Sequence, residues 1–216
     1  MSHLFQINTP KYIAMKSKII ILGTAHGVNV PGKCSPDKRL REYKFSREVI
    51  NDLAPELEAH GFTVYIDNPQ DEVPRPQATE LSTRCKFVNR ICAKHGKDNC
   101  RYVSIHVNAA GSDGRWHDAR GFCVYVARSC SEASKRLAKT FCDLAISRDL
   151  RGNRSVPSAH YWQANFYVLR NTACPAVLTE NLFQDNRADV DFLTSAAGKA
   201  AIVKLHLDAI LKHFEQ

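Results

Sequence analysis

Short apolar runs alternate along the chain with longer segments in which apolar residues recur at helical spacing. Four of the short runs are predicted to be buried strands: 18–22, 62–66, 101–107 and 121–127. Four of the longer segments are predicted to be helices: 41–60, 79–95, 131–147 and 187–214. After the third helix come a polar loop and two further apolar segments, 166–170 and 175–181.

This alternation predicts an α/β fold with a mostly parallel central sheet and helices on both of its faces. A length of 216 residues suits one well-buried domain. The chain has no internal repeat, low-complexity tract or linker that would divide it. We therefore expect a single domain over residues 18–216, preceded by an N-terminal extension at residues 1–17.

Ionisable side chains stand where the predicted strands end. His26 follows the first strand, His106 closes the third strand just before Asn108, and Glu180 lies near the end of the last apolar segment. The carboxyl ends of parallel strands converge on one edge of the sheet, where ligands bind. Glu42 opens the first helix and can face the same edge, although an acid at a helix start is also favoured by the helix dipole alone.

Two imidazoles and two carboxylates at one edge are suited to metal-assisted hydrolysis. A catalytic zinc ion takes three protein ligands, often two histidines and one carboxylate, and keeps an open position for water. A separate carboxylate must then accept the proton of that water. The alternative for each histidine is a loop or core residue with no chemical role.

Composition narrows the possible partners. The net charge is +8 and the sequence pI is near 9.1, which favours an anionic partner such as nucleic acid, acidic lipid or an acidic cell-wall polymer, or simply gives a soluble surface. The basic residues are scattered and no nucleic-acid-binding motif is present, so we expect no nucleic-acid partner. No apolar run approaches the roughly 20 residues of a membrane span, so we expect no membrane insertion. Eight cysteines without a C-x-x-C pair indicate reduced core residues.

Five motifs together resemble the zinc-dependent N-acetylmuramoyl-L-alanine amidases of the amidase-3 type. They occur in the same order as in that family, over about residues 18–212: GTAHGVNVPGK, REYKFS, STRCKFVNR, VSIHVNAA and PAVLTENLFQDN. The resemblance implies hydrolysis of the amide that joins the lactyl group of N-acetylmuramic acid to L-alanine of the stem peptide. Peptidoglycan is then the partner, and residues 18–216 form the catalytic amidase domain.

Position by position, the resemblance makes His26, Glu42 and His106 the ligands of one Zn²⁺ per chain, and Glu180 the general base that acts on water. Arg84 and Asn89, in TRCKFVNR, match an arginine and an asparagine of the family and are interpreted as structural supports of the site.

The chain departs from the family pattern at two positions. Gly23 stands where the family commonly has an aspartate before its first histidine loop, and Leu182 stands where a glycine often follows the catalytic glutamate. Both departures concern the surroundings of the site and leave the number of expected ligands unchanged.

Substrate contacts are expected from Asn108, at the end of its strand, and from His160 and Trp162, in a loop that can overhang the same edge. We interpret residues 150–165 as a specificity loop, since aromatic side chains there can stack on sugar or peptide, although packing against the domain is an equal alternative for them.

Two other classes compete with the amidase hypothesis. A zinc carboxypeptidase-like peptidase usually carries H-x-x-E, whereas Asn29 is the third residue after His26. A non-catalytic cell-wall binding protein would have no use for Glu180. The N-terminus lacks a signal-peptide pattern, so we expect a chain that is cytoplasmic as synthesised and acts on the wall after release or non-classical export. A monomer is the expected oligomeric state.

Overall fold

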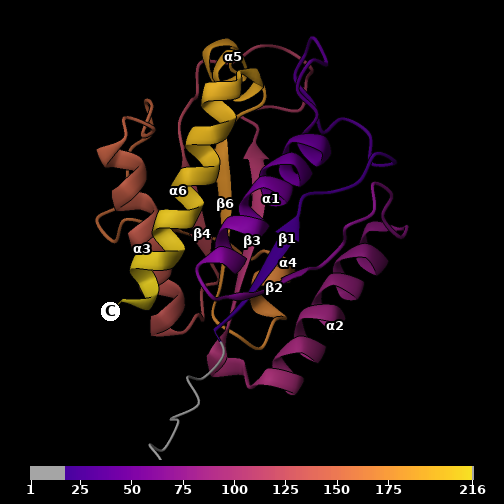
Figure 1. Ribbon diagram of the computed structural model, residues 1–216. Coiled ribbons are helices and arrows are strands. Elements are labelled where there is room, and N and C mark those ends of the chain that lie inside the picture. The colour runs from indigo at the N-terminus through magenta and orange to yellow at the C-terminus, as the bar shows by residue number, and fades with distance from the viewer. Residues whose placement is uncertain (1–17, 216) are drawn as a thin grey trace, which may run out of the picture.

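The computed structural model describes residues 18–215 (Figure 1), so the expected extension at residues 1–17 lies outside the described residues. The strands are β1 Ile19–Thr24, β2 Thr63–Ile66, β3 Cys100–Asn108, β4 Cys123–Val126, β5 Trp162–Gln163 and β6 Ala176–Phe183. The α-helices are α1 Glu42–Ala59, α2 Gln77–His95, α3 Glu132–Ser147, α4 Tyr167–Arg170, α5 Arg187–Thr194 and α6 Ala196–Phe214, and a short 3₁₀ helix covers Lys97–Asn99.

The six strands form one sheet in the order β2-β1-β3-β6-β4-β5. β2, β1, β3 and β6 are mutually parallel, β4 runs antiparallel to β6, and β5 is parallel to β4. The expected mostly parallel sheet is therefore confirmed. Its centre, β1-β3-β6, brings the carboxyl ends of three strands to one edge, and these are the strands that carry the candidate site residues.

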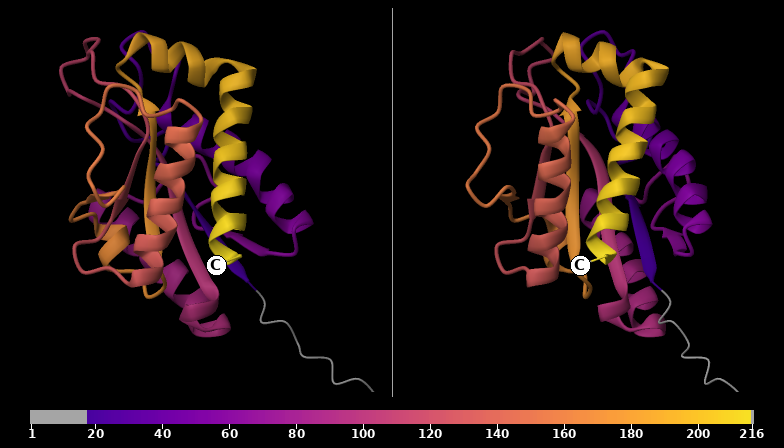
Figure 2. Two further views of the ribbon diagram at one scale, coloured as in Figure 1. Left: turned by 90° about the vertical axis from the view of Figure 1, so that its left-hand side faces the viewer. Right: turned by 60° about the vertical axis from the view of Figure 1, so that its left-hand side comes forward.

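Helices cover both faces of this sheet (Figures 1 and 2). On one face α1, α3 and α6 pack together and bury the side chains of one hydrophobic cluster, with α5 above them. On the other face α2 and α4 cover a second cluster. Because both faces are covered, β1 is buried along its whole length, which explains its unbroken apolar run.

The helix expected over 187–214 is two helices. Ser195 separates α5 from α6 with an extended backbone, and its hydroxyl accepts a hydrogen bond from Gly198 N as the N-cap of α6. A Cβ atom at Gly198 would overlap the carbonyl of Phe192, so the tight joint requires glycine. The apolar segment 166–170 is the short helix α4, and the two-residue strand β5 extends the sheet beyond β4.

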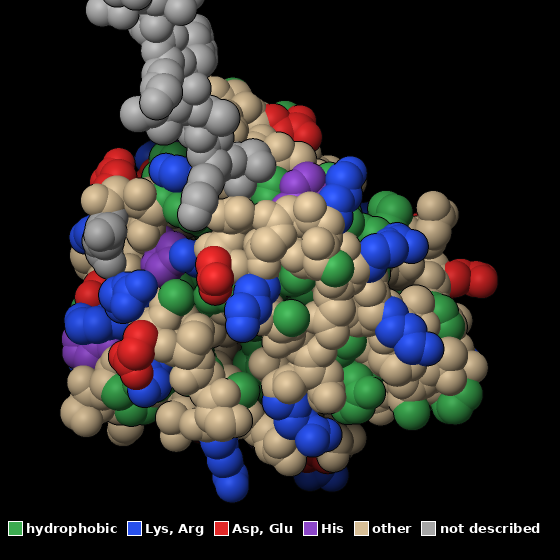
Figure 3. All heavy atoms as spheres, turned by 90° about the horizontal axis from the view of Figure 1, so that it is seen from below, with side chains coloured by type: hydrophobic (Ala, Val, Ile, Leu, Met, Phe, Trp, Pro, Cys, Tyr) green, Lys and Arg blue, Asp and Glu red, His purple; other side chains and the backbone are tan. Residues whose placement is uncertain are grey.

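Two expectations from composition also have a structural outcome. All eight cysteines lie in the described part of the chain and are free, and six of them are buried. Between residues 18 and 215 no helix combines the length and the apolarity needed to cross a bilayer. Seen from below in Figure 3, lysine and arginine side chains are scattered among neutral and acidic ones and form no continuous basic patch on that face.

Candidate active site

Three of the predicted side chains meet at the carboxyl edge of the sheet. His26 follows β1, Glu42 is the first residue of α1, and His106 lies near the end of β3. Glu42 Oε1 lies 2.9 Å from His106 Nδ1, and Glu42 Oε2 lies 3.4 Å from His26 Nε2. The two imidazole rings meet edge to face, with their centroids 5.3 Å apart. One ligand atom from each residue lies within 4.8 Å of the others.

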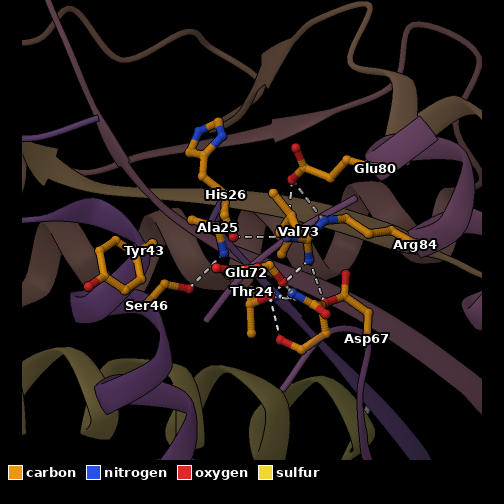
Figure 4. Close-up of polar contacts among 12 residues, drawn as sticks. Thr24, Ala25, His26, Tyr43, Ser46, Asp67, Glu72, Val73, Glu80 and Arg84 are labelled. Carbon is orange, nitrogen blue, oxygen red and sulfur yellow. Dashed lines mark hydrogen bonds and ion pairs between the residues drawn. The ribbon is translucent and has the colours of Figure 1, made fainter. Parts of the chain in front are cut away.

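The backbone of His26 is held in an uncommon conformation. Its φ is 40°, close to the left-handed region that few residues other than glycine adopt. Arg47 Nη2 donates to the carbonyl of His26 at 3.0 Å, and Arg84 Nη2 donates to the same carbonyl at 3.2 Å. Figure 4 shows the imidazole of His26 directed away from Arg84 while the carbonyl faces the guanidinium. Two buried cations thus stabilise the turn that presents this ligand.

Arg84 is itself fixed by buried carboxylates. Its Nη1 lies 2.7 Å from Asp67 Oδ1, and its Nη2 lies 3.2 Å from Glu80 Oε1. Asp67 also accepts hydrogen bonds from the backbone and side chain of Thr24, at the end of β1, and from the hydroxyl of Tyr102. Arg84 thus joins α2 to the loop that carries His26.

Burial dominates the electrostatics of the three-residue cluster. It lowers the pKa of His26 to about 4, and the negative charge of Glu42 offsets only part of that shift. Burial alone would raise the pKa of Glu42, but the hydrogen bond from His106 and the charges of both histidines hold it below its ordinary value. Glu42 also accepts a hydrogen bond from Val107 N at 3.2 Å. A buried anionic carboxylate beside a neutral imidazole is an environment that favours a cation.

The donor set fits a divalent metal ion, and zinc in particular. Two imidazoles and one carboxylate form a common ligand set of catalytic zinc sites. Ser104 Oγ lies 3.1 Å from His106 Nε2. This hydroxyl can donate to Nε2 when Nδ1 carries the proton toward Glu42, and it can accept from Nε2–H when Nδ1 binds a cation. Ser104 therefore orients the ring in either state.

Glu180 completes the constellation from the neighbouring strand. It pairs with His106 in the parallel register of β3 and β6, so both side chains leave the same face of the sheet. Its Oε2 is buried and has no hydrogen-bond partner within residues 18–215. Burial, together with the nearby charge of Glu42, raises the pKa of Glu180 well above its usual value. Once ionised, a carboxylate of raised pKa is a stronger base and can accept a proton from a reacting molecule.

A pocket of about 240 Å³ opens beside these groups. His26, His106 and Glu180 line one side of it, and residues of α2 and α4, among them Leu81 and Tyr167, line the other. The ionisable cluster is therefore accessible from a cavity that can hold part of a substrate.

Of the other predicted residues, some lie at the edge of the site and others lie outside it. Asn108 ends β3 on the edge that carries His106. Trp162, in β5, packs against Tyr125 of β4 with ring centroids 6.1 Å apart. The ring of His160 hydrogen-bonds to Asp143 of α3, and so points toward that helix. Asn89 donates to the Asn171 carbonyl and accepts from Ala173 N, and so fixes the turn before β6. The structure thus brings Asn108 to the edge of the site and leaves His160 and Asn89 outside the cluster.

Several supporting residues escaped the sequence reasoning. Arg47 and Ser104 contact the cluster directly, and Ser46 bridges the His26 loop to β3, since its hydroxyl accepts from Ala25 N and donates to the Ile105 carbonyl. Asp67 had a usable signal, because it follows the predicted strand 62–66 as His26 follows its own. Arg47 had no such signal, because its hydrogen-bond acceptors are backbone carbonyls.

Comparison with known proteins finds relatives of similar sequence. The N-acetylmuramoyl-L-alanine amidase CwlM of Bacillus licheniformis is 33% identical over 140 residues, which are 64% of this chain and 47% of CwlM. The probable cell wall amidase LytH of Staphylococcus saprophyticus is 24% identical over 208 residues, which are 96% of this chain and 62% of LytH. The chain therefore matches less than two thirds of the length of either relative.

Solved structures share the fold. The crystal structure of an N-acetylmuramoyl-L-alanine amidase from Clostridium difficile 630 superposes with a TM-score of 0.76 at 20% identity, covering 94% of this chain and 99% of that one. The catalytic domain of the amidase CwlV from Bacillus (Paenibacillus) polymyxa superposes with a TM-score of 0.73 at 21% identity, covering 92% of this chain and 98% of that one. Residues 20–212 match the family profile described as N-acetylmuramoyl-L-alanine amidase, so this chain belongs to the amidase-3 family.

Proposed function

We propose that this chain hydrolyses the amide between the lactyl group of N-acetylmuramic acid and L-alanine of the peptidoglycan stem peptide. The observation that carries the proposal is the meeting of His26, Glu42 and His106 within 4.8 Å, with Glu180 paired to His106 on the next strand. Membership of the amidase-3 family supports the same reaction.

We further propose that these three side chains hold one Zn²⁺ ion per chain. When bound, zinc supplies Lewis-acid chemistry: it lowers the pKa of a water ligand and polarises the substrate carbonyl. Glu42 contributes the negative charge, His26 is neutral because burial has lowered its pKa, and Ser104 fixes the ring of His106.

Glu180 is the proposed general base. Its unpartnered Oε2 takes a proton from the attacking water, and the water oxygen forms a bond to the amide carbon. The carbon–nitrogen bond then breaks, and the same proton passes from Glu180 to the leaving nitrogen of L-alanine. The products are a lactyl carboxylate on the sugar and a stem peptide with a free amino terminus.

Two alternatives account for fewer of these observations. A carboxypeptidase-like site would use the third residue after His26, but the Asn29 side chain bonds to both backbone groups of Val73 and holds the loop. A non-catalytic wall-binding protein gives no role to a buried, unpartnered carboxyl beside a set of metal donors.

The test is digestion of purified murein with and without a chelator, followed by mass spectrometry. The proposal predicts released peptides that begin with L-alanine and glycan strands with free lactyl carboxylates, both lost with chelator and restored by zinc. Cleavage within the peptide would favour the carboxypeptidase alternative. Binding without any cleavage would favour the wall-binding alternative.

The place of action is part of the same proposal. We propose that the chain acts as a monomer on the cell wall, after release from the cytoplasm or non-classical export, in a lytic role. Fractionation of producing cells, with immunodetection of the chain in cytoplasm, wall and medium, tests this assignment. A chain found only in the cytoplasm of intact and lysing cultures would contradict it.

A further inference from the structure

The pocket beside the candidate metal site is lined by a lysine that has no ion-pair partner among residues 18–215. Apart from the two histidines, its acidic and basic lining residues are Lys33, Glu80, Arg84 and the candidate base Glu180. Glu80 and Arg84 form an ion pair with each other, and Arg84 also pairs with Asp67, so their charges are satisfied within the fold. Lys33 has no acidic partner within 4 Å in the part of the chain that the structure describes.

Lys33 is held next to the reacting groups by its backbone. Its carbonyl accepts a hydrogen bond from Glu42 N at 3.0 Å, which fixes residue 33 at the start of α1. Its side chain lines the same pocket as His26 and Glu180. The side chain is exposed on the rim of the pocket, where an incoming ligand can reach it.

Apolar side chains form another part of the pocket lining. Leu81 of α2, Val168 of α4 and Phe166, which directly precedes α4, supply an apolar wall on which a peptide backbone and small side chains can lie. Among residues 18–215, Lys33 is the cationic residue of this lining that lacks an ion-pair partner, and a ligand that enters between this wall and the metal site meets it. The pocket therefore favours a ligand that carries an anionic group close to the bond being cleaved.

We propose that Lys33 binds a free carboxylate on the second residue of the stem peptide and makes the enzyme selective for acidic stems. This inference rests on the proposed amidase function. In peptidoglycan the residue after L-alanine carries either a free α-carboxylate, as D-isoglutamate, or a carboxamide, as D-isoglutamine. That group lies about two residues from the scissile nitrogen, or roughly 7 Å along an extended chain, which a lysine side chain on the rim can span.

The test uses two preparations of glycan-linked stem peptides that differ only in this carboxylate or carboxamide. Initial rates at low substrate concentration give kcat/KM for the wild-type chain and for Lys33→Met, Lys33→Arg and Lys86→Met. Lys86 is an exposed lysine of α2 without an ion-pair partner among residues 18–215, so its variant controls for the loss of one positive charge.

The wild-type chain is expected to prefer the carboxylate substrate by about three- to fivefold at low salt, the effect of one partly exposed ion pair. Lys33→Met should lose this preference through a lower rate on the carboxylate substrate alone. Lys33→Arg should keep the preference, and Lys86→Met should behave as wild type.

Equal wild-type rates on the two substrates would overturn the inference while leaving the amidase function intact. A Lys33→Met variant that loses rate equally on both substrates would also overturn it, because Lys33 would then act on the catalytic groups and not on the stem. Failure of the wild-type chain to release L-alanyl peptides from either preparation would instead remove the proposed function, and this inference with it.

Discussion

Glu180 and His106 lie side by side on two adjacent strands, in register, at the edge where the strands end. Both residues are therefore fixed by backbone hydrogen bonds of the central sheet and not by a mobile loop. Catalytic groups built on regular elements hold their geometry more accurately than groups on loops. This relationship makes the role of Glu180 separable by mutation from the binding of a metal ion.

Glu180→Gln keeps the size and shape of the side chain but removes the proton acceptor. We expect murein hydrolysis to fall by about 10²- to 10⁴-fold, the usual contribution of a general base. Zinc content, measured by elemental analysis after dialysis, should stay at one ion per chain. Activity within tenfold of wild type would remove Glu180 from the role of base.

Ser104→Ala removes the hydroxyl that contacts Nε2 of His106. Loss of such an orienting partner typically lowers metal affinity by about 10- to 100-fold. Competition with a chelating indicator measures this affinity directly. Ser147→Ala, at the exposed end of α3, is the matched control and should bind zinc as wild type does. Unchanged affinity in Ser104→Ala would show that the ring of His106 needs no such support.

Leu182 occupies a backbone conformation that suits glycine. Its φ is 65°, at a bulge where two residues of β6 lie opposite the single residue Val107 of β3. The side chain is buried, so removing it costs packing energy, whereas glycine alone relieves about 1 kcal/mol of backbone strain. We expect both variants to be less stable than wild type, with Leu182→Gly more stable than Leu182→Ala by about 1 kcal/mol. Urea unfolding measures the difference.

Leu178, on the same strand, supplies the comparison. It is also buried, but its φ is not positive. Here glycine should be the worse substitution, by about 0.5–1 kcal/mol relative to alanine. The same order at both positions would mean that the backbone of Leu182 is not strained.

His206 makes stability depend on pH. It is buried between α6 and β6, where its ring contacts the Ile202 carbonyl and the Thr179 hydroxyl, and burial lowers its pKa to about 4. The unfolded chain binds a proton at this residue below about pH 6.5, whereas the folded chain does not until about pH 4. The stability contributed by neutral His206 is therefore complete above pH 6.5 and is lost as the pH falls toward 4.

The free energy of unfolding of the wild-type chain should fall between pH 6.5 and pH 4 more steeply than that of His206→Gln. The difference in slope approaches about 1.4 kcal/mol per pH unit for one proton. His60→Gln, at the exposed end of α1, should keep the wild-type slope. Parallel curves for wild type and His206→Gln would contradict the assignment of this pH dependence to His206.

Much of the fold could be predicted from hydrophobic periodicity. The predicted helix 41–60 is Glu42–Ala59 in the structure, and the predicted strand 101–107 is Cys100–Asn108. The break at Ser195 was missed because both helices on either side carry the same periodicity, and only the serine cap and Gly198 mark the joint. β5 has two residues, too few for any periodic signal.

The site was predictable where a single residue follows a strand or opens a helix, as at His26, Glu42 and His106. It was not predictable where a residue acts through distant backbone atoms. Arg47 donates to the carbonyls of residues that precede it by more than twenty positions, and no spacing rule connects such partners. Likewise, a substrate contact was expected from His160 because it lies in a polar loop, but in the fold its ring hydrogen-bonds to Asp143.

The side chain of Tyr102 fills the space next to the Cα atom of Gly23. A Cβ atom at Gly23 would overlap the ring and hydroxyl of Tyr102, and that hydroxyl bonds to Asp67, which in turn holds Arg84. This geometry links Gly23 of β1 and Tyr102 of β3 to Asp67, which directly follows β2. Homologous chains with an aspartate in place of Gly23 are expected to carry a smaller residue in place of Tyr102, so the two columns should vary together across an alignment.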